Sequence, residues 1–193
     1  MMLRSRSVAC GVAIAVGMGG IALLPIQAAE QSDVNRLLRT GQCPRCNLSG
    51  VNLYGKKLQG ANLQGANLRQ ADLWGADLRQ ANLQGADLSE AELYGTDLRQ
   101  ANLQNTTLWG TDLVRARLMG TDLRGAKITS ANFRGANLEG ADFRTAKLWG
   151  VNFYGSQWQD ANFDGVDITS VNFDREGWQR TTRQVEYRNP VAP

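Results

Sequence analysis

A large apolar side chain recurs at every fifth position from Leu48 to Trp178, in 27 consecutive repeats without a slip. Leu fills 18 of these central positions, Phe five, Ile two and Trp two. The residue two places before the centre is small, being Ala, Thr, Val or Ser at all 23 sites from Ala61 to Val171. The residue directly before the centre is Asn or Asp in 19 of the 27 repeats. The consensus is therefore Ala-(Asn/Asp)-Leu-x-x, often with Gly in the last place.

A period of five fits neither regular secondary structure. Five steps along an α-helix rotate the apolar residue by about 140°, which spreads it around the whole surface. Five steps along a flat strand reverse its face each time. The backbone must therefore bend once per repeat, and glycine in the last place suits a turn that needs positive φ.

These repeats resemble the pentapeptide-repeat family, whose A(D/N)LXX pattern covers about two-thirds of the chain. The resemblance implies an all-β fold, a right-handed quadrilateral β-helix with four repeats per coil. It also implies that the apolar centre and the small residue point inward and that the other three residues point outward. Phe occupies every second centre from Phe133 to Phe173, so two opposite faces of the coil are expected to carry Phe columns.

Four repeats per coil would stack outward residues that are 20 apart, which defines a candidate interaction surface. Exposed aromatic columns can anchor a protein partner or stack on sugar rings, and they can also simply cover backbone and stiffen the ladder. Arginine and glutamine recur with the same spacing, Arg79 with Arg99 being one example. The candidate aromatic residues are Tyr54, Trp74 and Tyr94 in one column, with Tyr154 further along, and Trp109 and Trp149 on a neighbouring face.

The first residues have the layout of a secretory signal. Arg4 and Arg6 precede an uncharged apolar run from Val8 to Leu24, and small residues follow. Residues 1–28 are expected to form a signal peptide that is cleaved between Ala28 and Ala29, with no membrane span after cleavage. An uncleaved membrane anchor is the alternative, because the apolar run is longer than usual. The predicted location is the periplasm or the thylakoid lumen.

Residues 29–45 are expected to hold an N-terminal capping helix and a cysteine motif. A solenoid exposes backbone and core at its ends, so it needs caps. A short α-helix is predicted over residues 32–40, with Ser32 or Asp33 as its N-cap and Gly41 as its stop. Val34, Leu37 and Leu38 would form its apolar stripe. The β-helix is expected over residues 46–178, with Trp178 plugging its open end, and residues 179–193 form a tail that is a second candidate cap.

Cys43 and Cys46 form a CxxC motif. In an exported protein this spacing predicts a structural disulfide that pins the cap to the first coil, with Cys46 at the small inward site of its repeat. The alternative is a redox-active pair, because CxxC spacing beside a cation lowers a thiol pKa. A zinc site would need carboxylate ligands, since no other cysteine follows the signal segment.

Composition narrows the function classes. The chain contains no histidine, which removes the commonest general base and metal ligand. Its net charge of +3 falls to about +1 once the signal arginines are excluded, so nucleic-acid binding is not expected. Carboxylates such as Asp77 and Asp97 recur one coil apart and could bridge a cation, but interspersed basic residues indicate a solvated face. No catalytic residue, cofactor or metal site is predicted.

We therefore expect a non-enzymatic, exported scaffold that presents its surface to an unidentified protein partner, as a monomer or an end-to-end dimer. A redox-responsive protein acting through Cys43 and Cys46 is the alternative. The resemblance suggests a third possibility, a DNA mimic that protects a topoisomerase, but those relatives are strongly acidic and cytoplasmic, unlike this chain.

Overall fold

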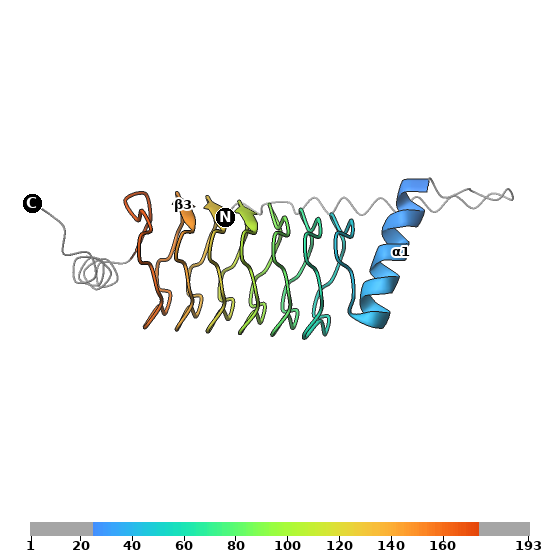
Figure 1. Ribbon diagram of the computed structural model, residues 1–193, viewed down its shortest axis with the longest axis horizontal. Coiled ribbons are helices and arrows are strands. Elements are labelled where there is room, and N and C mark those ends of the chain that lie inside the picture. The colour runs from blue at the N-terminus through green and yellow to red at the C-terminus, as the bar shows by residue number, and fades with distance from the viewer. Residues whose placement is uncertain (1–24, 174–193) are drawn as a thin grey trace, which may run out of the picture.

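The structure is a computed structural model, and it describes residues 25–173. Within this range it contains one helix, α1 (Pro25–Thr40), and three short strands, β1 (Thr107–Trp109), β2 (Lys127–Thr129) and β3 (Lys147–Trp149). Figure 1 shows that the chain winds in stacked coils along its long axis and that α1 lies at the N-terminal end of the stack. The strands pair in parallel in the order β1–β2–β3.

Each coil contains 20 residues, because backbone pairing joins residues that are 20 apart. Leu108 is in register with Ile128, and Ile128 with Leu148. The same offset runs through bridges from Gln42 with Asn62 to Asn152 with Asn172. Since one repeat has five residues, four repeats make one coil, as the family resemblance predicted. The fold is a β-helix solenoid in which every coil is hydrogen-bonded to the next.

The apolar centres fill the inside of the coils. All 26 centres from Leu48 to Phe173 are buried, with exposed fractions of 9% or less. The small residues from Ala61 to Val171 are buried as well, except for Ser156. Four of these small residues are threonines, and their hydroxyls donate to backbone carbonyl oxygens at 2.7–2.9 Å. Because a buried hydroxyl needs a hydrogen-bond partner, these bonds explain why threonine is tolerated inside the coils. The four threonines are Thr96, Thr106, Thr111 and Thr121.

The phenylalanines form the two predicted columns in the C-terminal half. Phe133, Phe153 and Phe173 stack on one face with ring centroids 4.9 and 5.3 Å apart. Phe143 and Phe163 stack at 4.7 Å on the opposite face. Rings of the two columns meet edge-on at 5.8–6.4 Å, which is a favourable aromatic geometry.

The corners of the coil require a residue with positive φ in the last place of the repeat. At Gly60, φ is +67°, and the N–H of Ala61 donates to the carbonyl of Leu58 at 3.0 Å. This is the geometry of a type II turn. Ten non-glycine residues of the described range adopt the same conformation, as Gln80 does with φ of 58°. The solenoid therefore imposes the conformation even where the sequence lacks glycine.

Helix α1 differs from the prediction at its start and along its exposed edge. It begins at Pro25, where a missing N–H and a fixed φ suit the first turn, so a cap at Ser32 or Asp33 is wrong. Leu37 is buried in the core and Val34 packs against it, but Leu38 is 47% exposed. Leu38 therefore does not belong to the buried stripe, because it is rotated by about 100° from Leu37. The helix ends before Gly41, which has the predicted positive φ.

The ladder begins earlier than the expected boundary at residue 46. Gln42 already pairs with Asn62, and Cys43 occupies an apolar centre five residues before Leu48. Residues 1–24, Trp178 and the tail 179–193 lie outside the described residues, whereas Ala28 and Ala29 lie within α1. No helix in the described range is long and apolar enough to cross a membrane.

Candidate functional site

Three outward rings of the candidate surface form a continuous stack, which we call the aromatic column (Tyr54, Trp74 and Tyr94). Each ring follows an apolar centre, so the 20-residue register places the three above one another. The ring centroids of Tyr54 and Trp74 are 6.3 Å apart, and those of Trp74 and Tyr94 are 4.7 Å apart. Tyr54 is 59% exposed, while Trp74 and Tyr94 are half-buried. The column therefore offers a ridge of apolar rings over three coils.

The other three candidate aromatics do not join this stack. Tyr154 lies on the same face as the column and is 54% exposed, but Val114 and Arg134 occupy the intervening coils. Trp109 and Trp149 lie on the neighbouring face, in β1 and β3, with exposed fractions of 48% and 69%. Thr129 is in register between these two tryptophans and separates them. They are isolated exposed rings rather than a second column.

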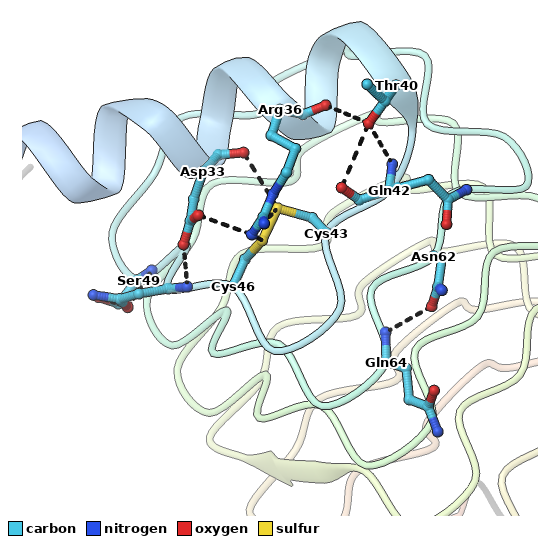
Figure 2. Close-up of a disulfide and its surroundings, with 10 residues drawn as sticks. Asp33, Arg36, Thr40, Gln42, Cys43, Cys46, Ser49, Asn62 and Gln64 are labelled. Carbon is cyan, nitrogen blue, oxygen red and sulfur yellow. Dashed lines mark hydrogen bonds and ion pairs between the residues drawn. A yellow bond between two sulfur atoms is a disulfide. The ribbon is translucent and has the colours of Figure 1, made fainter.

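Helix α1 and the first coil meet at a disulfide between Cys43 and Cys46 (Figure 2). Both cysteines are buried, with exposed fractions of 0% and 2%. Nη2 of Arg36 in α1 lies 2.6 Å from Sγ of Cys46 and 3.9 Å from Sγ of Cys43. The carboxylate of Asp33 pairs with Arg36 at 2.9 Å and accepts the N–H of Asn47 at 2.9 Å. These contacts attach the helix to the coil around the disulfide.

Asp33 lies close enough to the two sulfur atoms to form a three-residue cluster with metal-ligand chemistry. Zinc binds cysteine as the thiolate. In the structure the sulfurs of Cys43 and Cys46 are bonded to each other, and in that state neither can act as a thiolate ligand. In the oxidised protein these three residues therefore hold α1 against the first coil and do not form a metal centre.

Sequence reasoning missed a ladder of ion pairs on two other faces. Arg79 donates from Nε and Nη2 to both carboxylate oxygens of Asp77, at 2.8 and 2.7 Å. Asp97 accepts from Arg99 in the same way and lies 3.5 Å from Arg117 of the next coil. Aspartate followed two places later by arginine is the sequence signal for this arrangement. It recurs at Asp122 with Arg124 and at Asp142 with Arg144. The carboxylates that could have bridged a cation are therefore ion-paired with arginines.

The arginines lower the pKa values of these carboxylates. Hydrogen bonds from Arg79 hold the pKa of Asp77 below its usual value. Burial acts to raise the pKa of Asp97, but the hydrogen bonds and charge of Arg99, with the charge of Arg117, outweigh it and lower the pKa. A group whose pKa is depressed by folding stabilises the protein above its unfolded pKa of about 3.9 and loses that contribution as the pH falls through the folded value.

We predict that the double variant Asp77→Asn/Asp97→Asn is less stable than wild type by roughly 1 kcal/mol at pH 6, since partly exposed pairs contribute about 0.2–1 kcal/mol each. The difference should shrink as the pH is lowered from 6 to about 2, because the wild-type carboxylates are protonated as the pH falls below their unfolded pKa of about 3.9 and through their lowered folded pKa. Urea unfolding at both pH values measures this. Glu139→Gln is the control, because that exposed carboxylate makes no ion pair within the described residues. A difference that persists unchanged at low pH would contradict the role of the charges.

Comparison with known proteins identifies the class. The family described as pentapeptide repeats matches in eight copies within residues 46–175, and the chain belongs to this family. No curated protein matches the chain significantly.

Similar solved structures include other pentapeptide-repeat proteins. QnrB1, a plasmid-mediated fluoroquinolone resistance protein, is 21% identical over 79% of this chain and 88% of its own, with a TM-score of 0.48. Rfr23 from the cyanobacterium Cyanothece 51142 is 26% identical over 76% of this chain and 100% of its own, with a TM-score of 0.37. A protein from the Arabidopsis thaliana thylakoid lumen is 25% identical over 76% of this chain and 77% of its own, with a TM-score of 0.35.

Proposed function

We propose that the protein is a non-enzymatic scaffold that presents the aromatic column on a rigid solenoid to a protein partner. Pentapeptide-repeat proteins are generally structural or interaction proteins. The observation that carries the proposal is the ring-to-ring contact of Tyr54, Trp74 and Tyr94 over three coils, with Tyr54 59% exposed. Rigid aromatic side chains are preferred anchors of protein interfaces because they bury much area at little entropic cost.

A pull-down from periplasmic or luminal extract tests this proposal. The bait is wild-type protein beside the variant Tyr54→Ser/Trp74→Ser/Tyr94→Ser, with folding of both checked by circular dichroism. We expect wild type to retain a partner that the folded variant loses. The matched control is Trp109→Ser/Trp149→Ser, which removes exposed rings from the neighbouring face and should keep the partner. Equal recovery by all three baits, or recovery of nothing, would mean that the column only stiffens the ladder.

The chain organisation belongs to the same proposal. Residues 1–28 serve as an export signal that is cleaved between Ala28 and Ala29, leaving residues 29–40 of α1 to cap the first coil. The cap is supported by the burial of Leu37 and by the contacts of Asp33 and Arg36 with the cysteine segment. The repeat domain, whose ladder begins at Gln42, is proposed to extend to residue 178, with residues 179–193 as a tail. The mature protein resides in the periplasm or thylakoid lumen.

A second candidate function is a redox response through Cys43 and Cys46, favoured by the contact of Arg36 with both sulfurs. A thiolate of an external protein dithiol would attack Sγ of Cys46 and release Cys43 as a thiolate. The second external thiol would then displace Cys46, so that two electrons pass to this protein and the external pair becomes a disulfide. A guanidinium beside Cys46 would stabilise the thiolate product. Because both sulfurs are buried, this exchange requires α1 to move first.

A further inference from the structure

The face that carries the aromatic column is hollowed where the column is interrupted. The hollow has a volume of about 410 Å³. Its walls are the rings of Tyr94 and Tyr154, two residues of the same face that lie three coils apart. Val114 and two glycines are smaller than the rings on either side, which leaves the space between them open. The principal lining residues are Tyr94, Val114, Arg115, Arg134, Gly135 and Tyr154.

Two guanidinium groups line this hollow, and each is held against a tyrosine ring. Cζ of Arg115 lies 6.0 Å from the centroid of the Tyr94 ring, and its Nη1 donates to the hydroxyl of Tyr94 at 3.1 Å. Cζ of Arg134 lies 5.8 Å from the centroid of the Tyr154 ring. Cation–π contact restrains a planar guanidinium before any ligand arrives. Less conformational entropy is then lost on binding.

These two arginines differ from the other arginines that the structure describes between residues 46 and 173. Eight arginines lie between residues 46 and 173, and six of them pair with a carboxylate within 4.0 Å. Arg115 and Arg134 make no such pair with any described residue, and no acidic residue lines the hollow. Two guanidinium forks with no internal anion therefore share one concave site. The six paired arginines are Arg69, Arg79, Arg99, Arg117, Arg124 and Arg144.

We propose that this hollow binds a carboxylate of an acidic peptide segment of the partner protein, taken up by Arg115 and Arg134. The guanidinium fork matches a carboxylate with two parallel hydrogen bonds. The flanking tyrosine rings would pack against the apolar part of the same peptide. Because Tyr94 also ends the aromatic column, one peptide could contact both features. The inference rests on the proposed scaffold function and specifies the chemistry of its partner.

The test uses an array of immobilised hexapeptides that contain Asp and Glu, beside the same array with Asn and Gln in their place. Purified protein is applied as wild type and as Arg115→Gln/Arg134→Gln. The matched control is Arg124→Gln/Arg144→Gln, which removes two positive charges from arginines that already pair with Asp122 and Asp142. We expect wild type to bind a subset of acidic peptides and not their neutral counterparts. Affinity should fall at least tenfold in the first variant, since each fork makes charge-assisted bonds, and remain within about twofold in the control.

A second variant tests whether binding depends on the geometry of the two guanidinium groups beyond their charge, in a protein that retains its fold. Arg115→Lys/Arg134→Lys keeps both charges but replaces each fork by a point charge, so binding should weaken several-fold while the fold is retained. Four results would overturn the inference. They are unchanged binding in either variant, an equal loss of binding in the Arg124/Arg144 control, equal binding of the neutral peptides, and no peptide binding at all. Failure of the scaffold function looks different, because the pull-down would then yield no partner. A partner lost with Tyr54, Trp74 and Tyr94 but kept with Arg115→Gln/Arg134→Gln overturns only the carboxylate site.

Discussion

Replacing Phe153 by alanine is expected to lower the free energy of unfolding by about 3–5 kcal/mol. Phe153 is 1% exposed, and its ring meets four other phenylalanine rings. The variant would lose the transfer free energy of the ring and leave a cavity that the hydrogen-bonded coils on either side can close only partly. The ring also has partners in both Phe columns, so its loss removes the edge-on contacts that connect them.

Urea unfolding followed by circular dichroism measures this effect, with the slope of the free energy against urea used to detect partial unfolding. The control is Tyr154→Ala, which removes a neighbouring aromatic ring that is 54% exposed and should cost well under about 1 kcal/mol. A loss below about 1 kcal/mol for Phe153→Ala would show that the lumen relaxes around the gap and would contradict the close packing of the Phe columns.

Replacing Cys43 and Cys46 by alanine is expected to lower the free energy of unfolding by about 2 kcal/mol. The disulfide joins residues three apart, and closing so short a loop removes only about 2 kcal/mol of chain entropy from the unfolded state. The larger expected effect is on access to the bond. Both sulfurs are buried beneath α1, so reduction by dithiothreitol should be slow until the helix leaves.

Leu37 and Leu38 provide the matched pair for this second prediction. Leu37→Ala removes a buried side chain that joins α1 to the core, so the rate of reduction, followed by thiol labelling, should rise at least tenfold. Leu38→Ala alters a residue that is 47% exposed and should leave the rate unchanged. Rapid reduction of the Cys43–Cys46 disulfide in the wild type would contradict a buried structural role and favour the redox-responsive function. Equal rates in the two leucine variants would show that α1 does not gate the disulfide.

Much of the candidate site could be anticipated once the coil length was known. The 20-residue stacking of Tyr54, Trp74 and Tyr94 follows from the five-residue repeat together with the four repeats per coil that the family resemblance implied, and the rings do contact one another. The hollow between Tyr94 and Tyr154 was not anticipated, because it depends on side-chain contacts between coils, in which Arg115 reaches the ring of Tyr94 and Arg134 that of Tyr154. Arg124 follows Asp122 by two places and pairs with it, whereas Arg115 and Arg134 have no aspartate two places before them.

The sequence by itself determined the solenoid, because a strict five-residue spacing of apolar and small residues permits only a backbone that bends once per repeat. With the four repeats per coil that the family resemblance implied, it also predicted the two Phe columns, since alternate centres then lie on opposite faces. Tertiary structure decided what depends on contacts between coils and between α1 and the first coil. Leu37 is buried while Leu38 stays exposed, and Arg36 reaches the disulfide. Local patterns do not encode these choices, because each is made by packing and hydrogen bonding between segments that only the fold brings together.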